Sequence, residues 1–167
     1  MALAALLFAT PATAQPCLTA PEAEAIALVA LPEIIRQTGT VCATRLPPSS
    51  LVRRESSPLL TRYDAEATRA WPDARGAIVK LSMPEAALLL QSDYARPLLV
   101  TLLVPLIVGR IAMEDCGTID RLVTLIEPLP PRNTAALVVT GLQHLKSAKA
   151  RGRAGDVPDL PLCPVRP

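Results

Sequence analysis

Apolar and small side chains recur every three or four residues between positions 58 and 81, which is the period of one face of an α-helix. Charged residues fall between them, on the faces expected to point toward water. The pattern continues through Pro72, so it predicts either one long helix with a kink at this proline or two nearly collinear helices. The positions of the apolar face are Leu60, Tyr63, Ala67, Trp71, Ala74, Ile78 and Leu81.

A second helical pattern follows Cys17. Thr19 is a typical N-cap residue, and Glu22 stands three residues later, where the acid of a capping box is found. Pro32 should bend this helix, and Gly39 is expected just beyond its end. The pattern predicts a helix of about 18 residues, roughly 27 Å long.

Four further helices are expected along the chain, and no pair of strands with a turn signature occurs. They are expected to run from Pro84 to about Gln91, from Ser92 or Asp93 toward Met113, from Thr118 to Glu127, and from Asn133 or Thr134 to Ala148. The sequence therefore predicts an all-α bundle of five or six helices with proline kinks in a domain of residues 15–151. Residues 152–167 are rich in proline and are expected to form an extended tail, held to the domain through Cys163.

Residues 97–109, PLLVTLLVPLIVG, carry no charged side chain and are bracketed by Arg96 and Arg110. A straight helix of this length covers only about 20 Å of a hydrocarbon core near 30 Å. We therefore expect no transmembrane span here, and instead a helix buried on all sides at the centre of the bundle. The alternative is a re-entrant or membrane-associated segment. Leu102→Asp distinguishes the two, since it should unfold the protein only if Leu102 belongs to the core.

The first fifteen residues, MALAALLFATPATAQ, resemble an export signal in their pattern. An apolar run is followed by Pro11 and by the small-x-small sequence Ala12, Thr13, Ala14, at which a signal peptidase can cut. No Lys or Arg precedes the apolar run, which departs from the usual pattern. We expect residues 1–14 to be a cleaved signal peptide and the protein to be periplasmic or extracellular.

Four cysteines remain after the expected cleavage, namely Cys17, Cys42, Cys116 and Cys163. An even number of cysteines in an exported chain predicts two disulfides, with three possible pairings. A bond between Cys17 and Cys42 would need a sharp kink or folded-back flanks, because a straight helix places these residues at its opposite ends. No C-x-x-C motif points to redox or zinc chemistry.

Composition narrows the classes of partner. The chain has 17 Lys and Arg against 15 Asp and Glu, and this net charge of +2 is too small to predict nucleic-acid binding. One Trp, one Phe and two Tyr leave little material for stacking on bases or sugars. Neither a nucleophile elbow, nor a paired-histidine motif, nor a glycine-rich phosphate loop occurs, so no cofactor is expected.

Two features of the sequence combine residue types that can carry chemistry. His144, the single histidine, can act as a general base only if a partner reaches it from another helix. Met113, Glu114, Asp115 and Cys116 combine groups that bind metals, but adjacent residues of a helix point in different directions. We therefore expect His144 to be a boundary residue, the two acids to begin a helix, and no metal to bind.

Lys146, Lys149, Arg151 and Arg153 form a basic run with no acid between them. Such a run can contact anionic headgroups or another anionic polymer of the cell envelope. The simpler interpretation is that cations favour the C-terminal end of a helix and continue into a solvated tail.

Three functions remain open at this point. The first is a non-enzymatic, exported, disulfide-stabilised helical protein that binds a partner protein or an envelope component. The second is a peripheral binder of anionic membranes through the basic run. The third is an enzyme whose site is assembled from dispersed residues, which requires a concave site containing His144 or a pair of carboxylates from different helices.

Overall fold

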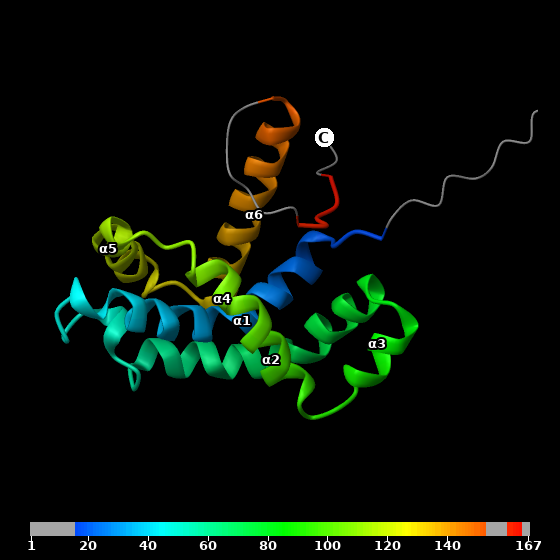
Figure 1. Cartoon of the computed structure of the whole chain (residues 1–167), viewed down its shortest axis with the longest axis horizontal. Helices are drawn as coiled ribbons and strands as arrows, with labels where there is room; N and C mark the ends of the chain where they lie inside the picture. Colours follow the sequence, from blue (N-terminus) through cyan, green and yellow to red (C-terminus); the bar gives the residue numbers. More distant parts are fainter. Residues whose placement is uncertain (1–15, 153–159, 165–167) are drawn as a thin grey trace, which may run out of the picture.

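Two long helices, α1 (Ala20–Val41) and α2 (Pro58–Leu81), pack against each other at the centre of the computed structural model, which describes residues 16–152 and 160–164 (Figure 1). The expected signal peptide at 1–14 and most of the expected tail lie outside these residues. The prediction of an all-α fold with five or six helices is confirmed, because the described residues form six α-helices and no strand. The remaining elements are α3 (Pro84–Leu89), α4 (Ala95–Val108), α5 (Cys116–Ile126) and α6 (Pro131–Ala150), with short 3-10 turns η1 (Cys42–Thr44), η2 (Leu51–Arg53) and η3 (Met113–Asp115).

The start of α1 follows its sequence signals. The Thr19 backbone N–H donates a hydrogen bond of 2.8 Å to Glu22 Oε2, as in a capping box. The Lys80 ammonium of α2 donates to the same oxygen at 2.6 Å and, together with the bonds from Thr19, lowers the pKa of Glu22 from 4.5 to about 2. This ion pair joins the first turn of α1 to the last turns of α2.

The predicted end of α1 was wrong. The helix continues past Gly39 to Val41. Gly39 is buried there, beside the backbone of Val52 in η2. A glycine occupies this position inside the helix because a neighbouring segment packs closely against it. Its presence in the sequence therefore reflects this close contact and does not mark the end of the helix.

The periodic segment from Pro58 to Leu81 forms one helix with Pro72 inside it. The predicted apolar face is confirmed at Leu60, Tyr63, Ala67 and Ala74, all of which are buried. The Tyr63 hydroxyl donates a hydrogen bond of 2.8 Å to Thr134 Oγ1 of α6, and burial raises the pKa of this tyrosine above its usual value.

Two predicted helix caps were wrong. Tyr94, rather than Ser92 or Asp93, is the N-cap residue of α4. In α6 the helix begins at Pro131, before the expected Asn133 or Thr134, because a proline in the first turn has no N–H to leave unbonded.

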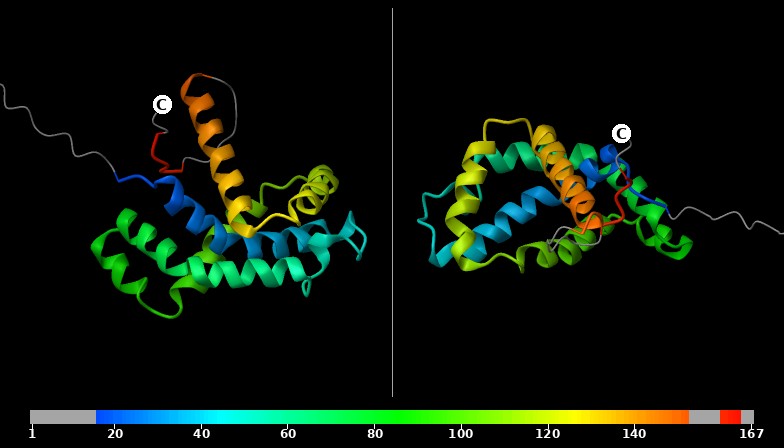
Figure 2. Two further views of the ribbon diagram at one scale, coloured as in Figure 1. Left: turned by 180° about the vertical axis from the view of Figure 1, so that it is seen from behind. Right: turned by 90° about the horizontal axis from the view of Figure 1, so that it is seen from above.

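Helix α1 packs against α2, α4 and α6, and the far end of α6 projects from the rest of the molecule (Figures 1 and 2). The C-terminal segment 160–164 returns to the start of α1. There the Leu18 N–H donates to the Pro161 carbonyl at 2.7 Å, and the Cys163 N–H donates to the Leu18 carbonyl at 2.8 Å. The two ends of the described chain are therefore joined by backbone hydrogen bonds.

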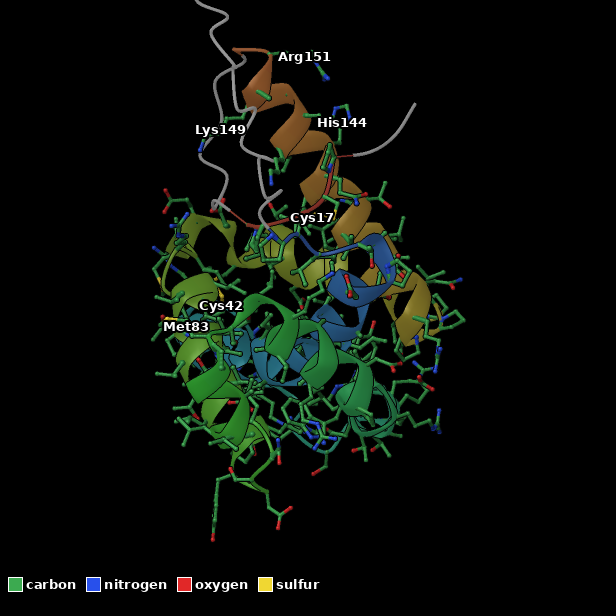
Figure 3. All side chains as sticks on the ribbon, turned by 90° about the vertical axis from the view of Figure 1, so that its right-hand side faces the viewer. Cys17, Cys42, Met83, His144, Lys149 and Arg151 are labelled. Atoms are coloured by element: carbon green, nitrogen blue, oxygen red, sulfur yellow. A yellow bond between two sulfur atoms is a disulfide. The ribbon has the colours of Figure 1, made fainter. Side chains whose placement is uncertain are left out.

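All four cysteines form disulfides, so the protein is a disulfide-stabilised helical protein. Cys17 pairs with Cys163, and Cys42 pairs with Cys116, with Cα atoms 4.9 and 5.6 Å apart. Cys17 and Cys42 lie before and after α1 and are well separated (Figure 3), as expected from the length of this helix. The Cys17–Cys163 disulfide holds segment 160–164 to the start of α1, and the Cys42–Cys116 disulfide holds the start of α5 to the end of α1.

Candidate functional site

The outer face of α4 is apolar and open to solvent, which makes it the first candidate for a binding surface. Leu98, Leu102 and Leu106 lie one turn apart and are 54%, 60% and 68% exposed. Leu103 and Ile107 beside them are exposed as well. The prediction that residues 97–109 form the buried central helix of the bundle was therefore wrong.

The physical reason is that α4 uses only a narrow stripe for packing. Val104 and Val108, four residues apart, are buried in a small cluster with Ala30 of α1. Val100, four residues before Val104, is partly buried and packs against the same cluster. The central position predicted for α4 is occupied instead by α1, which carries most of the larger buried cluster together with α2.

Two apolar stretches of helix approach the length needed to cross a membrane. Among the described residues, one helical run, Ala20–Thr44, is long and apolar enough to cross a membrane, and half of its most apolar part is buried inside the protein. Helix α4 passes the same test only together with Met113–Ile126, and a bend of 93° separates the two. Since half of its most apolar part is buried inside the protein, this run has the character of a core helix.

A cleft between α1, α2 and the start of α4 is the second candidate. It has a volume of about 510 Å³. Trp71 and Arg75 of α2 lie along it, opposite Arg96 at the start of α4. Val29 and Pro32 of α1 add apolar surface.

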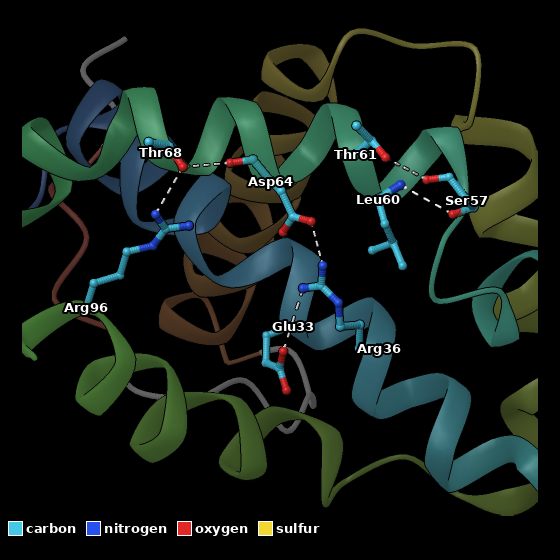
Figure 4. A network of polar contacts seen from close by, with 8 residues as sticks. All are labelled: Glu33, Arg36, Ser57, Leu60, Thr61, Asp64, Thr68 and Arg96. Atoms are coloured by element: carbon cyan, nitrogen blue, oxygen red, sulfur yellow. Dashed lines mark hydrogen bonds and ion pairs between the residues drawn. The ribbon is translucent and has the colours of Figure 1, made fainter.

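Ion pairs occupy one end of this cleft (Figure 4). Arg36 Nη2 donates to Asp64 Oδ2 at 2.5 Å, and Arg36 Nη1 lies 3.7 Å from Glu33 Oε2. The cleft thus contains two carboxylates from different helices, which is the arrangement that the enzyme hypothesis requires. The Arg36 guanidinium pairs with both carboxylates, and its pair with Asp64 holds α1 against α2.

Two further arginines line the cleft, and neither forms an ion pair with an acid of the described residues. Arg96 Nη1 donates to Thr68 Oγ1 at 3.1 Å (Figure 4), and no carboxylate of the described residues pairs with it. Arg75 has neither a hydrogen bond nor an ion pair within the described part of the chain. Asp93, which also lines the cleft, is exposed to solvent.

The residues singled out in the sequence lie elsewhere. His144 is exposed on α6, and it does not line the cleft (Figure 3). Lys146 of the basic run donates to the carbonyls of Leu160 and Leu162, at 2.7 and 2.9 Å, and so holds segment 160–164 against α6. Lys149 and Arg151 are exposed near the end of α6, and Arg153 lies outside the described residues. Contact of this run with an anionic surface stays a prediction.

The acids Glu114 and Asp115 lie in the 3-10 turn η3, immediately before α5. Cys116 is buried in its disulfide and is not available to a metal. No group of three potential metal ligands among His, Cys, Asp and Glu occurs within the described residues.

Sequence reasoning missed the cleft entirely. Its arginines come from three helices that are far apart in the chain, and no spacing rule connects Arg36, Arg75 and Arg96. The single tryptophan was a weak signal, because this large side chain is rarely buried completely.

Comparisons with protein-family models, with curated proteins and with solved structures gave no significant match to this chain.

Proposed function

We propose that this protein is an exported, non-enzymatic component of the cell envelope that binds a membrane surface through the outer face of α4. The observation that carries the proposal is the row of exposed leucines at positions 98, 102 and 106. Exposed apolar patches of this kind are characteristic of interaction sites, because water otherwise covers them at a free-energy cost.

The chemistry of this face favours lipid as the occupant. Its exposed side chains are aliphatic apart from Thr101, and no acid occurs between positions 97 and 109. Arg110 is exposed just after this face, where a cation attracts anionic headgroups. Tyr94, strongly exposed just before α4, belongs to a residue type enriched at membrane interfaces. A protein partner is more often held by a core of aromatic residues, which this face lacks.

Export is supported by two independent features. Both disulfides are typical of an oxidising compartment. The sequence of residues 1–14 has the apolar run and the cleavage pattern of a signal peptide. A periplasmic or extracellular protein with an apolar helix face is then well placed to lie on the outer side of a bilayer.

Vesicle flotation tests this function. The oxidised protein is mixed with vesicles of phosphatidylcholine and phosphatidylglycerol, and the fraction that floats is measured for the native chain and for Leu102→Asp/Leu106→Asp. Each leucine buried in lipid contributes about 2 kcal/mol, so the double variant should float at least about tenfold less. Leu137→Asp/Leu145→Asp on α6 is the matched control, because Leu137 is 58% exposed, close to Leu102.

The outcomes separate the alternatives. Equal flotation of the native chain and of the α4 variant would overturn the proposal. Binding that disappears in high salt, and is unchanged in the α4 variant, would assign the contact to the basic run instead. If nothing floats and sedimentation shows a dimer that the α4 variant dissociates, the occupant of the face is a second copy of the chain.

A further inference from the structure

The cleft between α1, α2 and the start of α4 has the dimensions of a site for a small molecule. Its volume of about 510 Å³ lies within the range typical of ligand pockets, roughly 300 to 1,000 Å³. It is formed by the inner side of α4, through Arg96 and Val100, while the exposed leucines lie on the outer side. The cleft and the proposed membrane face are therefore separate surfaces of one helix.

The charges of the cleft are unevenly paired. Three arginines and three acids line it, so their formal charges cancel in total. Arg36, however, pairs with both Glu33 and Asp64. Apart from these pairs, the lining contains two cations, Arg75 and Arg96, and one acid, Asp93, which is exposed to solvent. These three residues together carry a formal charge of +1.

The two guanidinium groups there have unused hydrogen-bond donors. Arg96 donates one bond to the Thr68 hydroxyl, and Arg75 has no partner among the described residues. A guanidinium has five N–H groups in a planar fork that matches a carboxylate or a phosphate. Arg96 also lies in the first turn of α4, where the helix dipole favours a negative charge.

Apolar surface lies beside these cations. The Trp71 ring is half-buried along the cleft, and Pro32 and Val100 line the same space. An indole face and two aliphatic side chains accept a ring or a short hydrocarbon, and they offer nothing to a fully hydrated inorganic ion.

We infer that this cleft binds a small organic anion. Its carboxylate or phosphate group accepts hydrogen bonds from Arg75 and Arg96, and its apolar body lies against Trp71. The inference does not depend on membrane binding, because it uses a different side of α4. A small ligand would also join α2 to the start of α4 through Arg75 and Arg96.

The fluorescence of Trp71 provides the measurement, since it is the only tryptophan of the chain. Phenyl phosphate is titrated into the oxidised protein while the emission is recorded, with inorganic phosphate and benzyl alcohol as probes that each lack one half of the anion. Phenyl phosphate should produce a saturable change, and the other two should bind at least about tenfold more weakly.

Variants locate the binding. Arg75→Gln should raise the Kd of phenyl phosphate about tenfold or more, and it should leave the fold intact because this side chain has no described partner. Arg54→Gln, at an exposed arginine outside the cleft, should leave the Kd unchanged. Circular dichroism confirms that each variant is folded.

The inference is overturned if phenyl phosphate gives no saturable change in emission and no heat in titration calorimetry. It is equally overturned if Arg75→Gln and Arg54→Gln weaken binding to the same extent. The Leu102→Asp/Leu106→Asp variant should still bind phenyl phosphate, so a failure of the membrane proposal and a failure of this one are distinguishable.

Discussion

Gly39 lies in the last turns of α1 at a point where the backbone of η2 crosses it. A Cβ atom added to Gly39 would lie 2.2 Å from the Val52 carbonyl oxygen and 3.0 Å from the carbonyl carbon. Cβ atoms essentially never come as close to another atom as 2.2 Å, and the neighbouring atoms belong to the backbone, which cannot turn aside. The contact explains why a glycine is buried inside a helix, where it otherwise costs stability.

Gly39→Ala is therefore expected to lower the free energy of unfolding by about 1–3 kcal/mol, as measured by urea denaturation. Gly76→Ala in α2 is the matched control, because a Cβ at this helical glycine meets nothing within 4 Å. The control should raise the stability by about 0.5–1 kcal/mol through the helix preference of alanine. Equal effects of the two substitutions would contradict this account of Gly39.

Sequence patterns at single residues were informative where the partner is local. Thr19 and Glu22 are three residues apart, so their capping box follows from spacing alone. Gly39 was misassigned because its partner, Val52, is brought to it by the fold. The same difference separates the disulfide bonds, whose existence was predicted, from their pairing, which was not.

At the scale of elements, α4 departs most from expectation. A helix that is hydrophobic on all sides is usually buried, and this rule placed α4 at the centre of the bundle. The rule fails here because hydrophobicity says nothing about how much surface the other helices leave available. Only the stripe through Val100, Val104 and Val108 packs against another helix.

Two substitutions in α4 compare the contribution of its buried stripe to stability with that of its exposed face. Val104 is fully buried, so Val104→Asp places a charge in the core and should unfold the protein or cost more than about 3 kcal/mol. Leu102→Asp, on the exposed face, should change the stability by less than about 1 kcal/mol. Thermal melts of both variants without lipid are the measurement. A large loss for Leu102→Asp would mean that this face is covered in solution.

At the scale of the whole molecule, two long-range disulfides close the described chain. Cys42 and Cys116 are buried between the end of α1 and the start of α5. Cys17 and Cys163 are only half-buried, where residues 160–164 meet the start of α1. Cross-links over 74 and 146 residues each remove much of the entropy of the unfolded chain, by about 4–5 kcal/mol in simple chain models.

The difference in burial predicts the order of reduction. Low concentrations of dithiothreitol should open Cys17–Cys163 first, because a thiolate must reach the sulfur that it attacks. Alkylation of the freed thiols followed by mass mapping identifies the first bond to open. Early labelling of Cys42 and Cys116 would show that the α1–α5 junction opens before the chain ends separate.

The amino-acid sequence by itself determined the helical class, the extent of α2 with its buried face, the cap of α1 and the presence of two disulfides. These features depend on side chains within one or two helical turns, or on simple counts, so short-range physical rules are sufficient. The tertiary structure alone decided the cysteine pairing, the exposure of α4 and the cleft between α1, α2 and α4. Each of these depends on which surfaces of distant helices compete for the same contact, and no local pattern carries that information.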